Sequence, residues 1–219
     1  MSLKNRSALS GVETGTEPRV RDFLERLCDT AALHARFLNT LSLLEHVGSR
    51  KIMASQTGTE LRQDTLKHLA EETRHAFFFK RAAETLAERA LDYGPSTTLA
   101  APAARFYMGR LDAYIDGAID EGMPPEAAYL YMSLIVELRA VWFYRLYQDV
   151  LAERGVALSL KSILAEETHH LDEMTARLRE IDPDLDSHRD AFMQFEDQRF
   201  RSLWTALERD CTAVQQSVG

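Results

Sequence analysis

Apolar positions recur with the helical period of 3.6 along almost the whole chain, and no run alternates as a β-strand would. Pro18 suits the first turn of a long helix that extends to about Met53. Gly155 is the natural left-handed residue at the end of a later one. The pattern therefore predicts an all-α protein, with helices over about 18–53, 59–91, 102–120, 125–154, 159–182 and 187–214.

The connections between these helices indicate how they pair. Thr57 and Glu60 make a capping-box pattern before the second helix, and Ser159 can cap the helix that follows Gly155. These short turns predict two antiparallel hairpins. A long connection with its own helix joins them, which is typical of a four-helix bundle with one crossover. We expect a flexible tail over 1–17, and a single domain over 18–219 that includes an extra C-terminal helix.

One heptapeptide occurs twice with little change. It reads LAEETRH in the first copy and LAEETHH in the second, so each copy contains Glu-x-x-His: Glu72 with His75, and Glu167 with His170. This spacing places a carboxylate and an imidazole on one helix face, one turn apart. A single Glu-x-x-His is weak evidence for a metal site, but two in near-identical heptapeptides are much stronger.

Two further glutamates, Glu45 and Glu137, each end an uncharged and largely apolar stretch of a predicted helix. A buried carboxylate without a partner costs several kcal/mol, so each needs a cation. The midpoint between Glu45 and Glu72 falls in the turn of the first hairpin, and that between Glu137 and Glu167 falls near Gly155. Each pair should therefore lie at one height. The predicted ligands, which we also expect to be the catalytic groups, are Glu45, Glu72, His75, Glu137, Glu167 and His170.

The donor types indicate which metal would bind. Four carboxylates neutralise two divalent ions, and two imidazoles add coordination without charge. Oxygen donors with imidazoles suit iron or manganese, and the sequence offers no thiolate set for a structural zinc. We therefore expect two iron ions as the cofactor, with manganese or a mixed manganese–iron pair as the alternative.

Composition excludes several other classes of protein. The net charge is −8 without a basic run, which argues against nucleic-acid binding. The tail has no apolar core of a signal peptide, and the longest uncharged stretch, 127–136, is too short to span a membrane. Cys28 and Cys211 form no CxxC pair and are expected to be reduced. These features predict a cytoplasmic protein that does not bind membranes; a homodimer is compatible with them.

With these ligands, about residues 20–180 resemble the ferritin-like di-iron carboxylate superfamily. The resemblance implies a ferritin-like bundle. Two Glu-x-x-His motifs make the chain similar to the oxygen-activating branch, in which each iron takes one imidazole; ferritin subunits usually lack the second histidine. The resemblance to this branch thus implies an oxidoreductase, either an oxygenase or an oxidase, that activates O2 on a small organic substrate. Because the sequence shows no flavin, haem or iron–sulfur motif, we expect a separate reductase or ferredoxin to supply electrons.

Individual residues indicate which members of this superfamily the chain resembles most. The segment from Glu71 to His75 is similar to the Asp-Glu-x-Arg-His motif of bacterial multicomponent monooxygenases, where the preceding acid orients a histidine. Glu71 and Glu166 stand in that position; plain surface charge is the alternative. Phe79 replaces the radical-forming tyrosine of ribonucleotide reductase small subunits, and the rubredoxin domain of rubrerythrins is missing. In length and ligand spacing the chain is most similar to small oxygenases such as aldehyde-deformylating oxygenase.

His68 precedes Glu72 by one turn and shares its helix face. The p-aminobenzoate N-oxygenases use a third histidine, but on the last metal-binding helix, where this sequence has Ile163. We therefore favour a supporting role for His68 over direct ligation, and both remain open. Small residues flank Glu45, which either leaves room for O2 and substrate or reflects close helix packing: Ser42, Gly48 and Ser49.

Two other functions compete with an oxidoreductase. The first is metal handling without an organic substrate, by iron oxidation, storage or peroxide scavenging. The second is a structural or regulatory bundle with a vestigial site.

Overall fold

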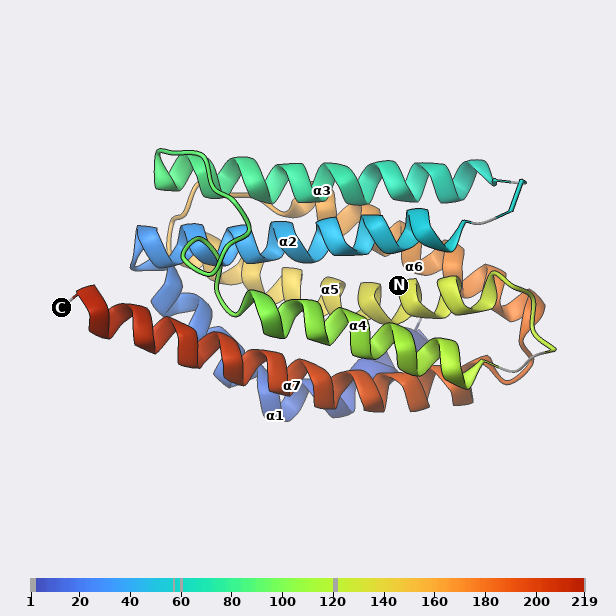
Figure 1. Ribbon diagram of the computed structural model, residues 1–219. Helices are drawn as coiled ribbons and strands as arrows, with labels where there is room; N and C mark the ends of the chain where they lie inside the picture. Colours follow the sequence, from blue (N-terminus) through green and yellow to red (C-terminus); the bar gives the residue numbers. More distant parts are fainter. Residues whose placement is uncertain (1–2, 57, 60, 120–121, 219) are drawn as a thin grey trace. The chain divides into compact units, whose positions relative to one another are not determined.

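The computed structural model describes residues 3–56, 58–59, 61–119 and 122–218, and all regular structure in these ranges is helical (Figure 1). The prediction of an all-α protein is confirmed. The described residues form seven helices: α1 (Leu3–Cys28), α2 (Ala31–Ser55), α3 (Gln63–Ala87), α4 (Ala101–Ala118), α5 (Ala127–Glu153), α6 (Lys161–Ile181) and α7 (Leu185–Val218). None of these helices combines the length and the apolar character that crossing a membrane requires.

The prediction of one uninterrupted helix over 18–53 is wrong, because the chain breaks between α1 and α2. Thr30 adopts an extended backbone with φ −131° at this break. Asp29 and Thr30 both favour helix ends over helix interiors, since their side chains compete for backbone hydrogen bonds. Helix α1 also begins at Leu3, so residues 3–17 are helical where the sequence predicts a flexible tail.

Helices α2 and α3 pack against each other as the first predicted hairpin (Figure 1). The capping box proposed for its turn involves Thr57 and Glu60, which lie outside the described residues. Polar side chains of α2 hold the segment that follows α3. Asn39 donates hydrogen bonds to the carbonyls of Asp92 and Thr97 at 2.7 and 2.8 Å. Thr40 donates to that of Leu99 at 2.9 Å. These buried bonds keep the loop on α2.

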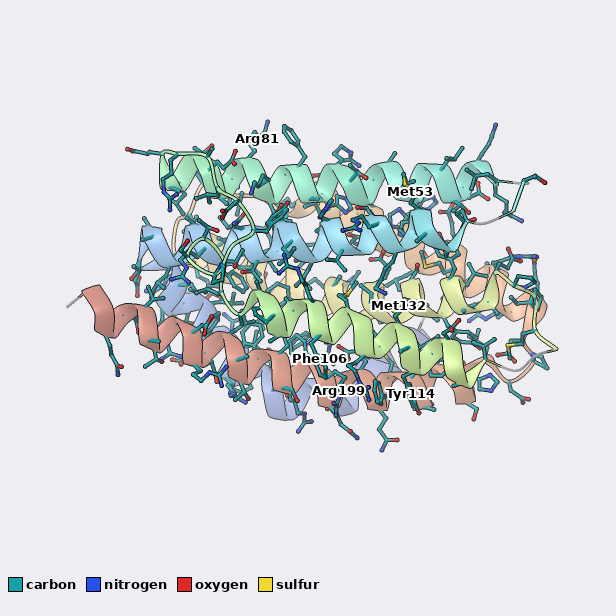
Figure 2. The ribbon with its side chains drawn as sticks, in the orientation of Figure 1. Met53, Arg81, Phe106, Tyr114, Met132 and Arg199 are labelled. Carbon is teal, nitrogen blue, oxygen red and sulfur yellow. The ribbon has the colours of Figure 1, made fainter. Side chains whose placement is uncertain are left out.

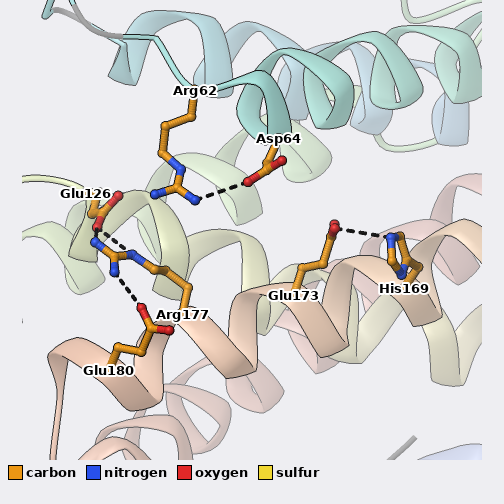
Figure 3. Close-up of polar contacts among 7 residues, drawn as sticks. All are labelled: Arg62, Asp64, Glu126, His169, Glu173, Arg177 and Glu180. Carbon is orange, nitrogen blue, oxygen red and sulfur yellow. Dashed lines mark hydrogen bonds and ion pairs between the residues drawn. The ribbon is translucent and has the colours of Figure 1, made fainter.

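Helices α5 and α6 form the second hairpin. Gly155 ends α5 with φ +67°, as the sequence predicts. The Val156 amide bonds to the carbonyl of Leu151, and the Gly155 amide to that of Ala152, which together form a Schellman motif. Ser159 does not cap α6, since the N-cap residue is Leu160. Across the open end of the hairpin, Arg177 binds Glu126 and Glu180 (Figure 3).

The chain divides into two compact units. The α5–α6 unit comprises Met1–Asp22 and Gly109–Arg201, and the α2–α3 unit comprises Phe23–Met108 and Ser202–Gly219. Helices α1, α4 and α7 contribute residues to both. The single domain expected over 18–219, and its ferritin-like topology, stay predictions.

Each unit has its own aromatic packing. In the α2–α3 unit, the Phe23 ring lies edge-on to two others. Its centroid is 5.7 Å from that of Phe37 and 5.0 Å from that of Trp204.

In the α5–α6 unit, Arg139 of α5 pairs with the buried Glu196 of α7 at 2.7 Å. Its guanidinium also lies 4.3 Å from the centre of the Phe200 ring. Such a buried, doubly supported ion pair fixes how α5 and α7 pack within this unit.

A buried carboxylate joins three helices at the far end of α6. Asp182, which ends α6, accepts a hydrogen bond from the Tyr131 hydroxyl of α5. Its Oδ2 also lies 2.7 Å from Nδ1 of His188 on α7. Burial alone raises the pKa of the Asp182 carboxyl, but its contacts with Tyr131 and His188 outweigh burial and hold that pKa below its usual value.

We expect Asp182→Ala to lower the free energy of unfolding by about 1–3 kcal/mol at pH 7, because the Tyr131 hydroxyl then stays buried without its acceptor. A carboxyl whose pKa falls on folding stabilises the protein above its unfolded-state pKa and loses that effect as pH falls through the folded pKa. The variant should therefore lose less stability than the parent between about pH 5 and pH 2. Urea titrations across this range measure both effects.

The control for this prediction is Tyr131→Phe, which removes the hydroxyl itself. In that background Asp182→Ala should cost less than in the parent, because fewer groups lose their partner. Equal costs in the two backgrounds would contradict the role assigned to the Tyr131–Asp182 bond.

Candidate metal centre

A group of four buried ionisable side chains belongs to the α2–α3 hairpin. Glu45 comes from α2, and His68, Glu72 and His75 come from α3; their exposed fractions are 8%, 5%, 6% and 0%. The three α3 residues follow each other at intervals of four and three, which aligns them along one helix face. The helical period thus explains why α3 presents all three on one side.

These side chains lie close enough to share a cation. One possible ligand atom from each of Glu45, Glu72 and His75 lies within 4.8 Å of the others. Oε1 of Glu72 lies 3.5 Å from Nδ1 of His75 and 3.6 Å from Nε2 of His68. His68 therefore approaches Glu72 as closely as His75 does. The structure brings His68 into the cluster and leaves both of its predicted roles open.

The electrostatics of Glu72 depend on the two imidazoles. Burial raises the pKa of its carboxyl, but the contacts with His68 and His75 outweigh burial and hold the pKa well below its usual range. Even so, Oε1 of Glu72 is buried and makes no hydrogen bond to any group in the described part of the chain. A buried carboxylate oxygen in this condition suits a metal ion.

A second buried cluster lies in the α5–α6 unit. Glu137 of α5 and Glu167 and His170 of α6 are all at most 3% exposed. Nδ1 of His170 lies 2.9 Å from Oε2 of Glu167 and 3.7 Å from Oε1 of Glu137. The cluster thus gathers two carboxylates around one imidazole nitrogen. With both carboxylates ionised, the charges of this cluster sum to a negative value whether the imidazole is neutral or protonated, and that also favours a cation.

The two heptapeptide copies adopt the same local geometry. In each, Nδ1 of the histidine faces the carboxylate of its own Glu-x-x-His, at 3.5 Å in His75 and 2.9 Å in His170. In each hairpin the neighbouring helix adds one more buried glutamate, Glu45 or Glu137. The sequence repeat is therefore also a structural repeat.

The two remaining candidates, Glu71 and Glu166, and the neighbouring His169 lie nearer the surface. Glu71 is partly buried and pairs with Lys67 at 3.9 Å, and Glu166 is also partly buried. His169 is 57% exposed and pairs with Glu173 at 3.1 Å (Figure 3), so it points away from the buried cluster. Its exposure agrees with its position in the repeat, where it corresponds to Arg74.

The structure adds a neighbour that the sequence did not indicate. The Ser42 hydroxyl donates to the Ala76 carbonyl at 2.7 Å and lies 2.8 Å from the Tyr93 hydroxyl. The ammonium of Lys80 in turn lies 4.1 Å from the centre of the Tyr93 ring. Tyr93 follows α3 in a loop, where no periodic pattern marks a residue, so only the fold could place it beside the helix that carries the cluster.

Taken together, buried histidines and glutamates form groups that could hold metal ions. The chemistry of the donors, carboxylate oxygens with imidazole nitrogens, fits iron or manganese. Which of these side chains bind metal stays a prediction. No family model, curated protein or solved structure matches this chain.

Gly48 offers a test of the space beside Glu72. A Cβ atom at Gly48 would meet Oε2 of Glu72 at 3.6 Å, an ordinary contact. Gly48→Ala should therefore keep metal binding and, as an alanine in a helix, stabilise the protein by roughly 0.5–1 kcal/mol. Gly48→Leu should displace the carboxylate and weaken metal binding at least about tenfold, a cost of about 1.4 kcal/mol. Competition with a metallochromic chelator measures the affinity; equal affinities in the two variants would contradict this geometry.

Proposed function

We propose that the two buried clusters together form one centre for two metal ions, preferably iron, in a ferritin-like bundle, and that the protein is an oxidoreductase that activates O2. The ligands would be Glu45, Glu72 and His75 from one hairpin and Glu137, Glu167 and His170 from the other. The substrate would be a small organic molecule, and the reaction an oxygenation or an oxidation.

The observation that carries this proposal is the equivalence of the two clusters. Each hairpin supplies one buried Glu-x-x-His and one buried glutamate from its neighbouring helix. A site for two ions needs two such sets, and four carboxylates balance the charge of two divalent cations. A solvated helix face would not require this repeat of buried groups.

Bound iron would supply the redox chemistry, for which no ordinary side chain is suited. The protein's own residues would prepare the site for it. Nδ1 of His75 and of His170 must release any proton before a metal binds, since a ligand nitrogen needs its lone pair. Nε2 of His68 lies 3.6 Å from Oε1 of Glu72, and in the supporting role that we favour for it this histidine would hold a proton beside that carboxylate. Apolar residues around the clusters would exclude bulk water.

The first test of the proposal is stoichiometry. We expect about two iron ions per chain after anaerobic reconstitution, as in other two-metal sites. Glu137→Gln should abolish this two-iron content but leave the metal-free protein as stable or more stable, because a neutral amide is cheaper to bury than a carboxylate. Elemental analysis and thermal unfolding measure the two effects.

Glu173→Gln is the matched control, because Glu173 also lies on this hairpin but is exposed. It should bind iron as the parent does. One ion per chain in the parent, or an unchanged iron content in Glu137→Gln, would show that the ligand set is wrong.

The second test concerns O2. The iron-loaded, reduced protein should react with O2 far faster than free ferrous iron, because a preorganised site holds both metals ready. Either His75→Ala or His170→Ala should suppress that reaction while far-UV circular dichroism stays helical, since apolar packing supplies most helix stability. His169→Ala should react like the parent.

Metal handling remains the competing function, and the fate of added iron separates the two. An oxidoreductase should saturate at two ions per chain and turn over only with reductant and substrate. Iron that keeps accumulating far beyond two would favour storage and overturn the oxidoreductase proposal.

A further inference from the structure

The face of α3 opposite the buried cluster is both basic and apolar. Between Thr65 and Glu84, none of the exposed side chains is acidic. Phe77 is 62% exposed and Leu66 47%. We call this surface the outer α3 face; it consists of Leu66, Lys67, Ala70, Thr73, Arg74, Phe77 and Arg81.

Its charges are regularly spaced. Lys67, Arg74 and Arg81 follow each other at intervals of seven residues. Seven residues are about two helical turns, so all three lie along one side of α3. Arg81, which projects from α3 in Figure 2, lies 5.7 Å from the centre of the Phe77 ring. The positive charges therefore flank an exposed aromatic side chain.

The positive charge of the outer α3 face indicates which kind of partner it would bind. Two copies of the chain related by a two-fold axis would set the basic row against itself, which costs energy. Three basic residues are also fewer than the four to eight that mark anionic-membrane binding sites. A partner protein with carboxylates around an apolar depression would pair with the basic row and bury Phe77, the type of aromatic anchor that interfaces favour.

We infer that the outer α3 face docks an acidic protein that delivers electrons. Its electron-donating role rests on the proposed function, whereas the docking follows from the face itself. His68, Glu72 and His75 lie on the opposite side of the same helix, about one helix diameter of roughly 10 Å away. A donor bound here would thus be separated from the candidate ligands by α3 alone.

The test uses an acidic plant-type [2Fe–2S] ferredoxin as the probe and measures its binding to the metal-free protein by fluorescence anisotropy at several salt concentrations. We expect binding that weakens as salt rises, because the attraction is between surface charges. Lys67→Glu with Arg81→Glu should weaken binding at low salt by roughly tenfold or more. Phe77→Ser should weaken it at all salt concentrations.

The matched control is Arg154→Glu with Arg209→Glu, which changes the net charge equally at exposed positions outside the face. It should alter binding by less than about twofold. Circular dichroism verifies that all variants remain helical. No salt-dependent binding, equal losses in the control, or binding to phosphatidylglycerol vesicles instead of ferredoxin would each overturn the docking inference.

A second measurement tests the donor role. Reduced ferredoxin is mixed anaerobically with the ferric protein; each ferredoxin loses one electron and each ferric ion gains one, so two ferredoxins should reduce one fully loaded chain. Lys67→Glu with Arg81→Glu should slow this reduction. Docking without reduction would overturn the donor role. A chain that docks ferredoxin but binds no iron would instead refute the proposed function, so the two failures are distinguishable.

Discussion

Carboxylates are among the most expensive side chains to bury, and four buried glutamates of this helical protein have histidine rather than arginine beside them. Glu45 and Glu72 are buried in one hairpin, and Glu137 and Glu167 in the other. Each pair is accompanied by histidine, but Oε1 of Glu72 still makes no hydrogen bond within the described residues. Without metal, the burial of these carboxylates should therefore lower the stability of the protein. Two divalent cations would remove that loss. The proposed centre is the simplest account of that cost.

The fold meets this demand through local rules. The helical period brings His68, Glu72 and His75 to one face of α3, and the repeat does the same for Glu167 and His170 on α6. Short turns then set Glu45 and Glu137 beside them. On α3 the same period separates the two functions that we assign to this helix: candidate ligands on the inner face, and basic and aromatic residues on the outer one.

Much of this could be predicted from sequence because it depends on periodicity and on local turns. The helical class and the stop of α5 at Gly155 are confirmed. Features that depend on the balance between competing local signals were predicted less well. The break at Asp29–Thr30 was missed because apolar positions continue across it, and Ser159 was expected to cap α6, although Leu160 occupies that position. The approach of Tyr93 to Ser42 depends on how a loop packs against α2, which the spacing of residues does not determine. The bundle topology stays a prediction.

The central claim is that both hairpins contribute ligands to one two-metal centre. Crystallography of the iron-loaded protein, with anomalous diffraction measured on either side of the iron absorption edge, tests it most directly. The account predicts two neighbouring iron peaks in the interior, contacted by Glu72 and His75 from one hairpin and by Glu167 and His170 from the other. A single peak, or iron bound by only one hairpin or at the surface, would contradict it.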